Sequence, residues 1–101
     1  MMELDLDEYA EGAIKLDGFE SAIIGVVREF GNGPRILYSI PKILEILQQN
    51  SDMTYSDAEE YFDYNIIGGY FGEQNPIFLD REINPTFNGS YWEYHLDNRY
   101  I

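Results

Sequence analysis

Apolar residues recur at helical spacing in the segment "SIPKILEILQQN". They lie three or four residues apart and form one broad stripe, made of Ile43, Leu44, Ile46 and Leu47. Ser39 precedes the stripe and can cap a helix with its side-chain oxygen, and Pro41 falls in the first turn, where a missing N–H costs little. The pattern therefore predicts a helix that follows Ser39 and terminates at Asn50.

A second helical pattern follows in "MTYSDAEEYFDYNIIGG". Its core-facing stripe comprises Ala58, Tyr61, Phe62, Asn65 and Ile66. Ser56 and Glu59 have the spacing of a capping box, and Thr54 with Asp57 is a weaker version of the same signal. We expect Gly68 to end this helix, and the Gly68-Gly69 pair to supply a positive φ for a tight exit.

Three shorter apolar runs are typical of strands. The run 22–27 ("AIIGVV") is rich in β-branched residues and favours a buried strand, although a helix closed by Gly31 competes with it. The runs 35–39 ("RILYS") and 76–80 ("PIFLD") are predicted strands as well, the second with a tolerable proline at its start.

The two ends of the chain differ from its middle. Residues 1–12 are acidic, and their alternating leucines predict either a short edge strand or a loose acidic arm. Residues 83–101 form an aromatic tail in which Asn88-Gly89 is a strong hairpin signal and Pro85 indicates an edge strand. After the turn, alternation predicts one strand face of Trp92, Tyr94 and Leu96 and an opposite face of Tyr91, Glu93 and His95.

These elements together predict the α+β class for a single domain over residues 1–101. Two main helices would pack on a small, mostly antiparallel sheet, and a hairpin would follow at the C-terminus. A compact chain of this length has a radius of gyration of about 13 Å.

Charge narrows the range of partners. Nineteen Asp and Glu against six Lys and Arg give a net charge of −13. Direct binding to nucleic acid or to an anionic membrane is disfavoured, because both need Lys and Arg contacts. A basic partner is favoured, and an acidic protein without such a partner is the plainer alternative. With no cysteine, no membrane-length apolar run and an acidic rather than basic start, the sequence favours a cytoplasmic protein.

Catalytic patterns are missing from the sequence. His95 is the one histidine and there is no cysteine, so a zinc site would need an otherwise all-carboxylate ligand set. No nucleophile-elbow or phosphate-loop spacing occurs, and "GNGPRI" lacks the Lys-Ser/Thr ending of a phosphate loop. We therefore expect no catalytic residues, no metal and no cofactor, and we expect the protein not to be an enzyme.

The remaining candidate is a surface for a partner. Acids three residues apart on a helix have neighbouring β-carbons about 5–6 Å apart, which approaches the spacing of successive phosphates. A solvated helix face is the commoner meaning of such a charge pattern. The candidate partner-binding residues are Asp57, Glu60, Asp63, Tyr64, Tyr70 and Glu73.

Three segments resemble a family of small phage and prophage proteins. They are "DGFESAIIGV", "ILYSIPKILEIL" and "MTYSDAEEYFDYNIIGGYFGEQNPIFLD". The ending of the third segment matches the family pattern G-x-[YFW]-x-G-E-x-x-P-x-[FW], and the resemblance spans residues 17–80. It implies a phage context and no established activity, so it carries over no catalytic residues.

Phage context and acidity together suggest a function. We expect an acidic phage-type binding protein that inhibits a basic, nucleic-acid-binding host partner, such as a CRISPR complex or another defence effector, by nucleic-acid mimicry in the host cytoplasm. The aromatic tail offers a surface for homo-oligomerisation. The alternative is a small-ligand-binding protein or enzyme with a pocket near Gly69–Glu73.

Overall fold

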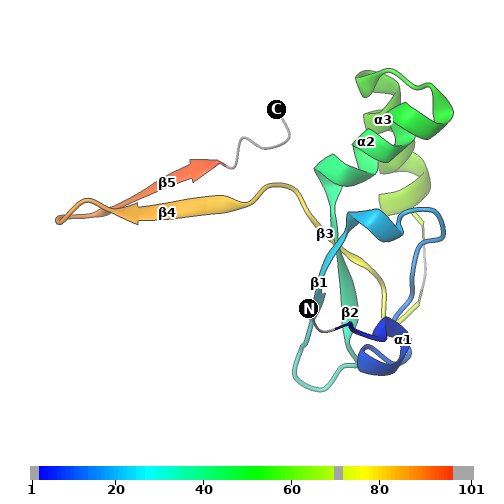
Figure 1. Cartoon of the computed structure of the whole chain (residues 1–101), viewed down its shortest axis with the longest axis horizontal. Helices are drawn as coiled ribbons and strands as arrows, with labels where there is room; N and C mark the ends of the chain where they lie inside the picture. The colour runs from blue at the N-terminus through cyan, green and yellow to red at the C-terminus, as the bar shows by residue number, and fades with distance from the viewer. Residues whose placement is uncertain (1–2, 70–71, 97–101) are drawn as a thin grey trace.

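The computed structural model describes residues 3–69 and 72–96. Figure 1 shows a small sheet, helices to one side of it, and a hairpin that projects from the other side. The elements are, in order, α1 (Leu6–Tyr9), the 3₁₀ turn η1 (Glu20–Ala22), β1 (Ile23–Val27), β2 (Arg35–Ser39), α2 (Ile40–Ser51), α3 (Tyr55–Tyr61), the π-helix η2 (Phe62–Ile67), β3 (Ile77–Leu79), β4 (Ile83–Phe87) and β5 (Trp92–Leu96). This is the α+β domain that the sequence predicted, including the strand rather than the helix after Ala22.

The main sheet has the order β1-β2-β3, with β2 in the centre. β1 runs antiparallel to β2, and β3 runs parallel to it. Ile36 and Tyr38 point from β2 into the core and are fully buried. Leu37, Ile77 and Leu79 lie at alternate positions, on the second face of the sheet, and they are half-buried.

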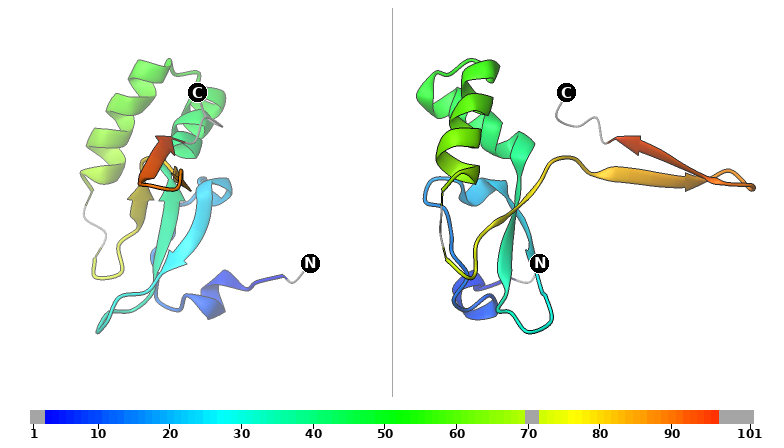
Figure 2. Two further views of the ribbon diagram at one scale, coloured as in Figure 1. Left: turned by 90° about the vertical axis from the view of Figure 1, so that its left-hand side faces the viewer. Right: turned by 180° about the vertical axis from the view of Figure 1, so that it is seen from behind.

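The helices and the N-terminal segment cover the same face of the sheet (Figure 2). The predicted core residues Leu44, Leu47 and Phe62 are at most 4% exposed. Phe62 meets Phe78 of β3 edge-to-face, with ring centroids 5.2 Å apart, so that one aromatic contact ties the helices to the sheet.

The sequence predicted the start of α2 correctly, but it placed the end of this helix one residue too early. Ser39 caps α2 by accepting the Lys42 N–H, as predicted. The helix continues past Asn50 to Ser51, and Asp52 takes the left-handed conformation with φ 54°.

At the next helix, the stronger of two competing cap signals was the wrong one. Thr54, not Ser56, caps α3, because its hydroxyl accepts the Asp57 N–H at 3.1 Å. Ser56 and Glu59 consequently lie inside the helix.

Gly68 ends the second helix but does not supply a positive φ. Its φ is −71°, and its N–H bonds to the Asp63 carbonyl five residues back, as in a π-helix. A β-carbon at this position would lie 3.0 Å from the Tyr64 carbonyl oxygen. Close backbone approach is therefore the reason for glycine here.

The acidic N-terminus is neither an edge strand nor a loose arm. Asp5 caps α1 by accepting the Glu8 N–H, and the helix is only four residues long. Ala10 is buried in the core, so the segment is anchored just after this helix.

The C-terminal hairpin extends well beyond the rest of the domain (Figures 1 and 2). β4 and β5 pair only with one another among the described residues. The radius of gyration is 15.8 Å, larger than the compact value we expected, because this arm projects outward. The predicted edge character of the strand with Pro85 is confirmed, since a two-stranded sheet consists of edges.

Tyr38 links the N-terminal segment to the core and gives a testable pH dependence. Its hydroxyl accepts the Leu16 N–H at 2.8 Å, and burial raises the pKa of the Tyr38 phenol above its usual value. The unfolded chain loses this proton first, so the contribution to stability is complete below pH of about 10 and is lost as the pH rises further.

We therefore expect Tyr38→Phe to lower the free energy of unfolding by about 1 kcal/mol at neutral pH through the lost hydrogen bond. The difference between wild type and variant should shrink above pH of about 10. Urea unfolding at several pH values measures it. A difference that stays constant into the alkaline range would show that Tyr38 does not carry this dependence.

Candidate functional site

A groove of about 490 Å³ lies between α2 and α3 and reaches the connection from β3 to β4. Apolar side chains from both helices line it, among them Leu44, Phe62 and Ile67. The first two are buried, so they form its floor, whereas Ile67 is half-exposed.

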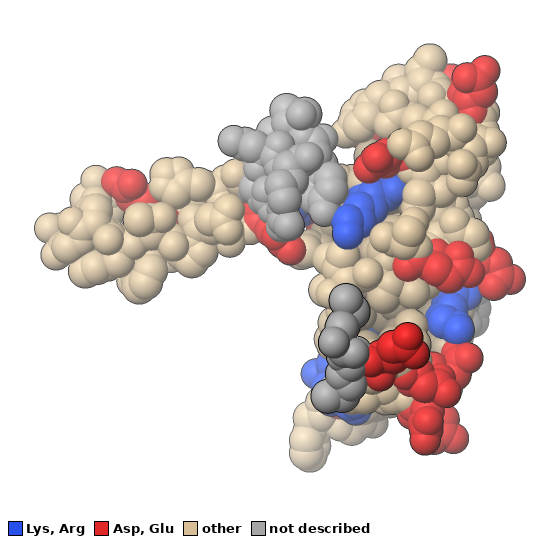
Figure 3. All heavy atoms as spheres, in the orientation of Figure 1, with Lys and Arg blue, Asp and Glu red and all other residues tan. Residues whose placement is uncertain are grey.

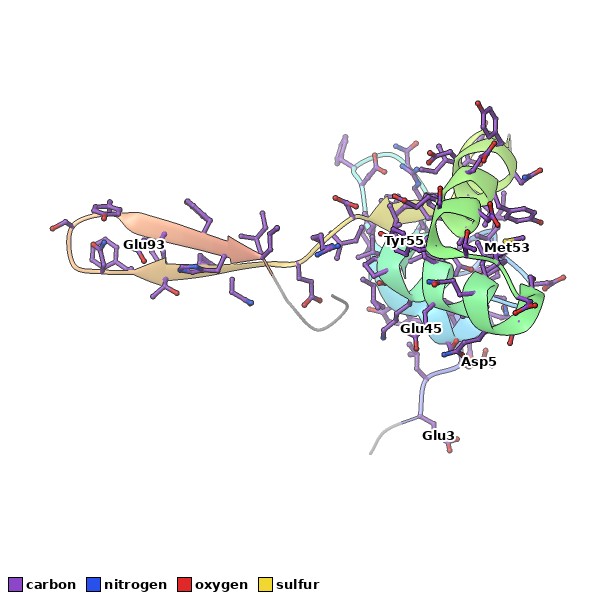
Figure 4. All side chains as sticks on the ribbon, turned by 90° about the horizontal axis from the view of Figure 1, so that it is seen from above. Glu3, Asp5, Glu45, Met53, Tyr55 and Glu93 are labelled. Atoms are coloured by element: carbon purple, nitrogen blue, oxygen red, sulfur yellow. The ribbon has the colours of Figure 1, made fainter. Side chains whose placement is uncertain are left out.

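Four exposed carboxylates surround this apolar floor. Glu45 comes from α2, and Asp80 follows β3. Glu59 and Asp63 come from α3 and η2, which together form the second helical segment. Arg81 is the single Lys or Arg among the described lining residues. Figure 4 shows Glu45 and Tyr55, another lining residue, on the side of the helices from which the hairpin leaves.

The spacing of the second helical segment explains which residues reach the groove. Its buried positions, Ala58, Phe62 and Ile66, are four residues apart. The groove positions have the same spacing and are Tyr55, Glu59, Asp63 and Ile67. Residues four apart span slightly more than one turn of the α-helix α3 and slightly less than one turn of the wider π-helix η2, so the two rotations offset one another and both sets keep their sides along the segment.

Among the described residues, no Lys or Arg forms a close ion pair with a groove acid. Within the described residues, the Lys and Arg ion pairs are Lys15 with Asp7 and Arg35 with Glu29, each at 2.6 Å. Neither pair involves a groove carboxylate. Figure 3 shows acidic side chains spread over the body of the domain and few on the hairpin. The groove thus combines an apolar floor with a negative rim.

Four of the residues that the sequence grouped as a partner surface lie on the continuous helical segment formed by α3 and η2. Asp57, Glu60 and Tyr64 are exposed, and Asp63 is exposed and lines the groove. Glu73 is exposed on a different segment. Tyr70 lies outside the described residues.

Sequence reasoning missed three of the four groove acids. The sequence assigned Glu59 to a capping box with Ser56, and this box does not form. Because Thr54 is the cap instead, the Glu59 side chain can line the groove. Glu45 and Asp80 stand on separate elements, so no local spacing connects them to Glu59.

The expected ligand pocket near Gly69–Glu73 stays a prediction. A more open hollow of about 330 Å³ includes Gly69, Asn75 and Arg35 among its described lining residues. Arg35 is already engaged, since its Nε donates to the Asn75 carbonyl at 2.7 Å and its Nη1 to Glu29 at 2.6 Å.

Within the described residues, two kinds of site are absent. No group of three or more His, Cys, Asp or Glu side chains there is placed to hold a metal ion. No helix in the same ranges has the length and apolar character needed to cross a membrane. His95 lies on the hairpin, where its Nε2 is 3.7 Å from a Glu93 carboxylate oxygen.

Comparisons with protein-family models, curated proteins and solved structures found no match to this chain.

Proposed function

We propose that the protein binds a basic, nucleic-acid-binding partner and that the acidic groove receives part of the partner's basic surface. The observation that carries this proposal is the gathering of Glu45, Glu59, Asp63 and Asp80 around an apolar floor. A Lys or Arg side chain suits such a site, because its stem packs on apolar surface while its charged end meets carboxylates.

Occupation of the partner's basic surface would inhibit it. Lys and Arg residues that bind phosphates are the same residues that an acidic protein attracts, so the two ligands compete. The net charge of −13 adds long-range attraction to the local contacts. The phage resemblance of residues 17–80 supports a host defence effector, such as a CRISPR complex, as the partner in the host cytoplasm.

Affinity capture from host lysate tests this function. The immobilised chain should retain a nucleic-acid-binding protein at physiological salt and lose it near 1 M salt, because the Debye length falls from about 8 Å to about 3 Å. Added nucleic acid should release the captured protein, since both occupy the same surface.

Recovery of no nucleic-acid-binding protein at low salt would remove the main support for the proposal. If neither high salt nor added nucleic acid released the captured protein, the acidic groove would not be the site of contact. In that case a small ligand near Gly69–Glu73 becomes the better hypothesis.

A further inference from the structure

The β4–β5 hairpin has one apolar face and one polar face. Directly paired residues of an antiparallel ladder point to the same side. The pairs Ile83–Leu96, Pro85–Tyr94 and Phe87–Trp92 therefore share one face. The pairs Asn84–His95 and Thr86–Glu93 make up the other face.

The apolar face has no cover within the described residues. Tyr94 is 69% exposed, and its neighbours Ile83, Phe87, Trp92 and Leu96 are between 54% and 57% exposed. Phe87 and Trp92 contact one another, with ring centroids 5.3 Å apart, but this contact lies within the hairpin. A lone two-stranded hairpin is at best marginally stable in water, so this face needs an apolar surface to pack against.

Charge distinguishes between the occupants that could cover this face. Between Ile83 and Leu96 there is one acid, Glu93, and no Lys or Arg. A basic partner is therefore attracted to the acidic body rather than to the arm (Figure 3). A second copy is repelled by the body, whereas two near-neutral arms can meet at little electrostatic cost.

The area is sufficient for such a contact. Burial of an aromatic side chain covers about 150–250 Å², so the six half-exposed residues of the face offer on the order of 600 Å² per copy. Two copies would bury about 1,200 Å², the lower bound of stable protein interfaces. The half-buried sheet face with Leu37, Ile77 and Leu79 lies on the side from which the arm projects, and it can add to this area (Figures 1 and 2).

We propose that the chain forms a two-fold symmetric dimer in which the apolar faces of two β4–β5 hairpins stack on one another. A two-fold axis needs a surface that is complementary to itself, and an uncharged aromatic face meets this condition. The two arms hold the acidic bodies apart, and the dimer presents two acidic grooves to a partner. The dimer contact is independent of the proposed binding function.

A matched pair of lysine substitutions tests the dimer. Tyr94→Lys places a charge in the middle of the apolar face, opposite Pro85, and Thr86→Lys places the same charge on the polar face, opposite Glu93. Light scattering coupled to size exclusion should give about twice 11.8 kDa for wild type and for Thr86→Lys. Tyr94→Lys should give 11.8 kDa. Circular dichroism checks that both variants fold.

Three outcomes would overturn the proposal. They are a monomeric wild type at high micromolar concentration, a dimer that survives Tyr94→Lys, and equal dissociation of both variants. The effect of salt distinguishes the dimer contact from partner binding. Added salt should strengthen the dimer, because it screens the repulsion between the two acidic bodies, and it should weaken the binding of a basic partner.

Trp92 gives an independent readout, because it is the sole tryptophan of the chain and lies on the apolar face. Its fluorescence should shift to shorter wavelength as the concentration rises and the dimer forms. Tyr94→Lys should remove this shift. An emission maximum that does not change with concentration in a dimeric wild type would place the interface elsewhere.

Discussion

Phe62→Ala should destabilise the domain by about 3–5 kcal/mol, the range for loss of a buried aromatic side chain. Phe62 is 3% exposed and its ring meets Phe78 of β3, so the substitution leaves a cavity between the helices and the sheet. Domains of this size have about 5–15 kcal/mol of total stability, so the loss is a large fraction of it. Each kcal/mol corresponds to about 4–8 °C in melting temperature, which makes the shift easy to measure by circular dichroism.

Tyr64→Ala is the matched control for this prediction. Tyr64 lies on the same helical segment and is 77% exposed, so its removal should change the free energy of unfolding by less than about 0.5 kcal/mol. Similar melting temperatures for Phe62→Ala and wild type would mean that the helices do not pack on the sheet as described.

The sequence predicted elements whose signals are local. Ser39 and Pro41 mark the start of α2 within one turn, and both are found where the pattern placed them. The alternation of Trp92, Tyr94 and Leu96 is likewise local, and the hairpin confirms it. The register adds the opposing residues of β4, which complete the apolar face.

Features that depend on distant contacts were missed. Thr54 and Ser56 both precede an acid by three residues, so the local pattern does not distinguish between them, and Thr54 is the cap in the structure. The π-helix η2, which carries Asp63 and Ile67 of the groove, has no signal in the one-dimensional pattern. The groove was unpredictable for the same reason, since its acids come from three separate parts of the fold.

Loss of the groove charges should weaken binding of a basic partner much more than loss of equal charge elsewhere on the same helices. The double variant Glu45→Gln/Glu59→Gln removes two carboxylates of the groove, whereas Asp57→Asn/Glu60→Gln removes two that lie outside its described lining. An exposed ion pair contributes up to about 1 kcal/mol, so loss of both groove carboxylates should lower the affinity by up to about 30-fold. The outer pair should change it by less than about threefold, mainly through the association rate.

A synthetic peptide of alternating arginine and leucine is a defined probe for this comparison. Titration followed by calorimetry gives the affinities, and amide chemical shifts should move at the groove positions of both helices. Asp57 lies in the first turn of α3, where its charge favours the helix, so thermal unfolding must show that the outer variant remains folded.

The pattern of losses separates three mechanisms. Loss confined to the groove variant supports a site that holds cationic side chains over an apolar floor. Loss confined to the outer variant supports the phosphate-like helix face that the sequence suggested. Equal losses would show that net charge alone attracts the probe, because general acidity depends on the number of charges and not on their positions.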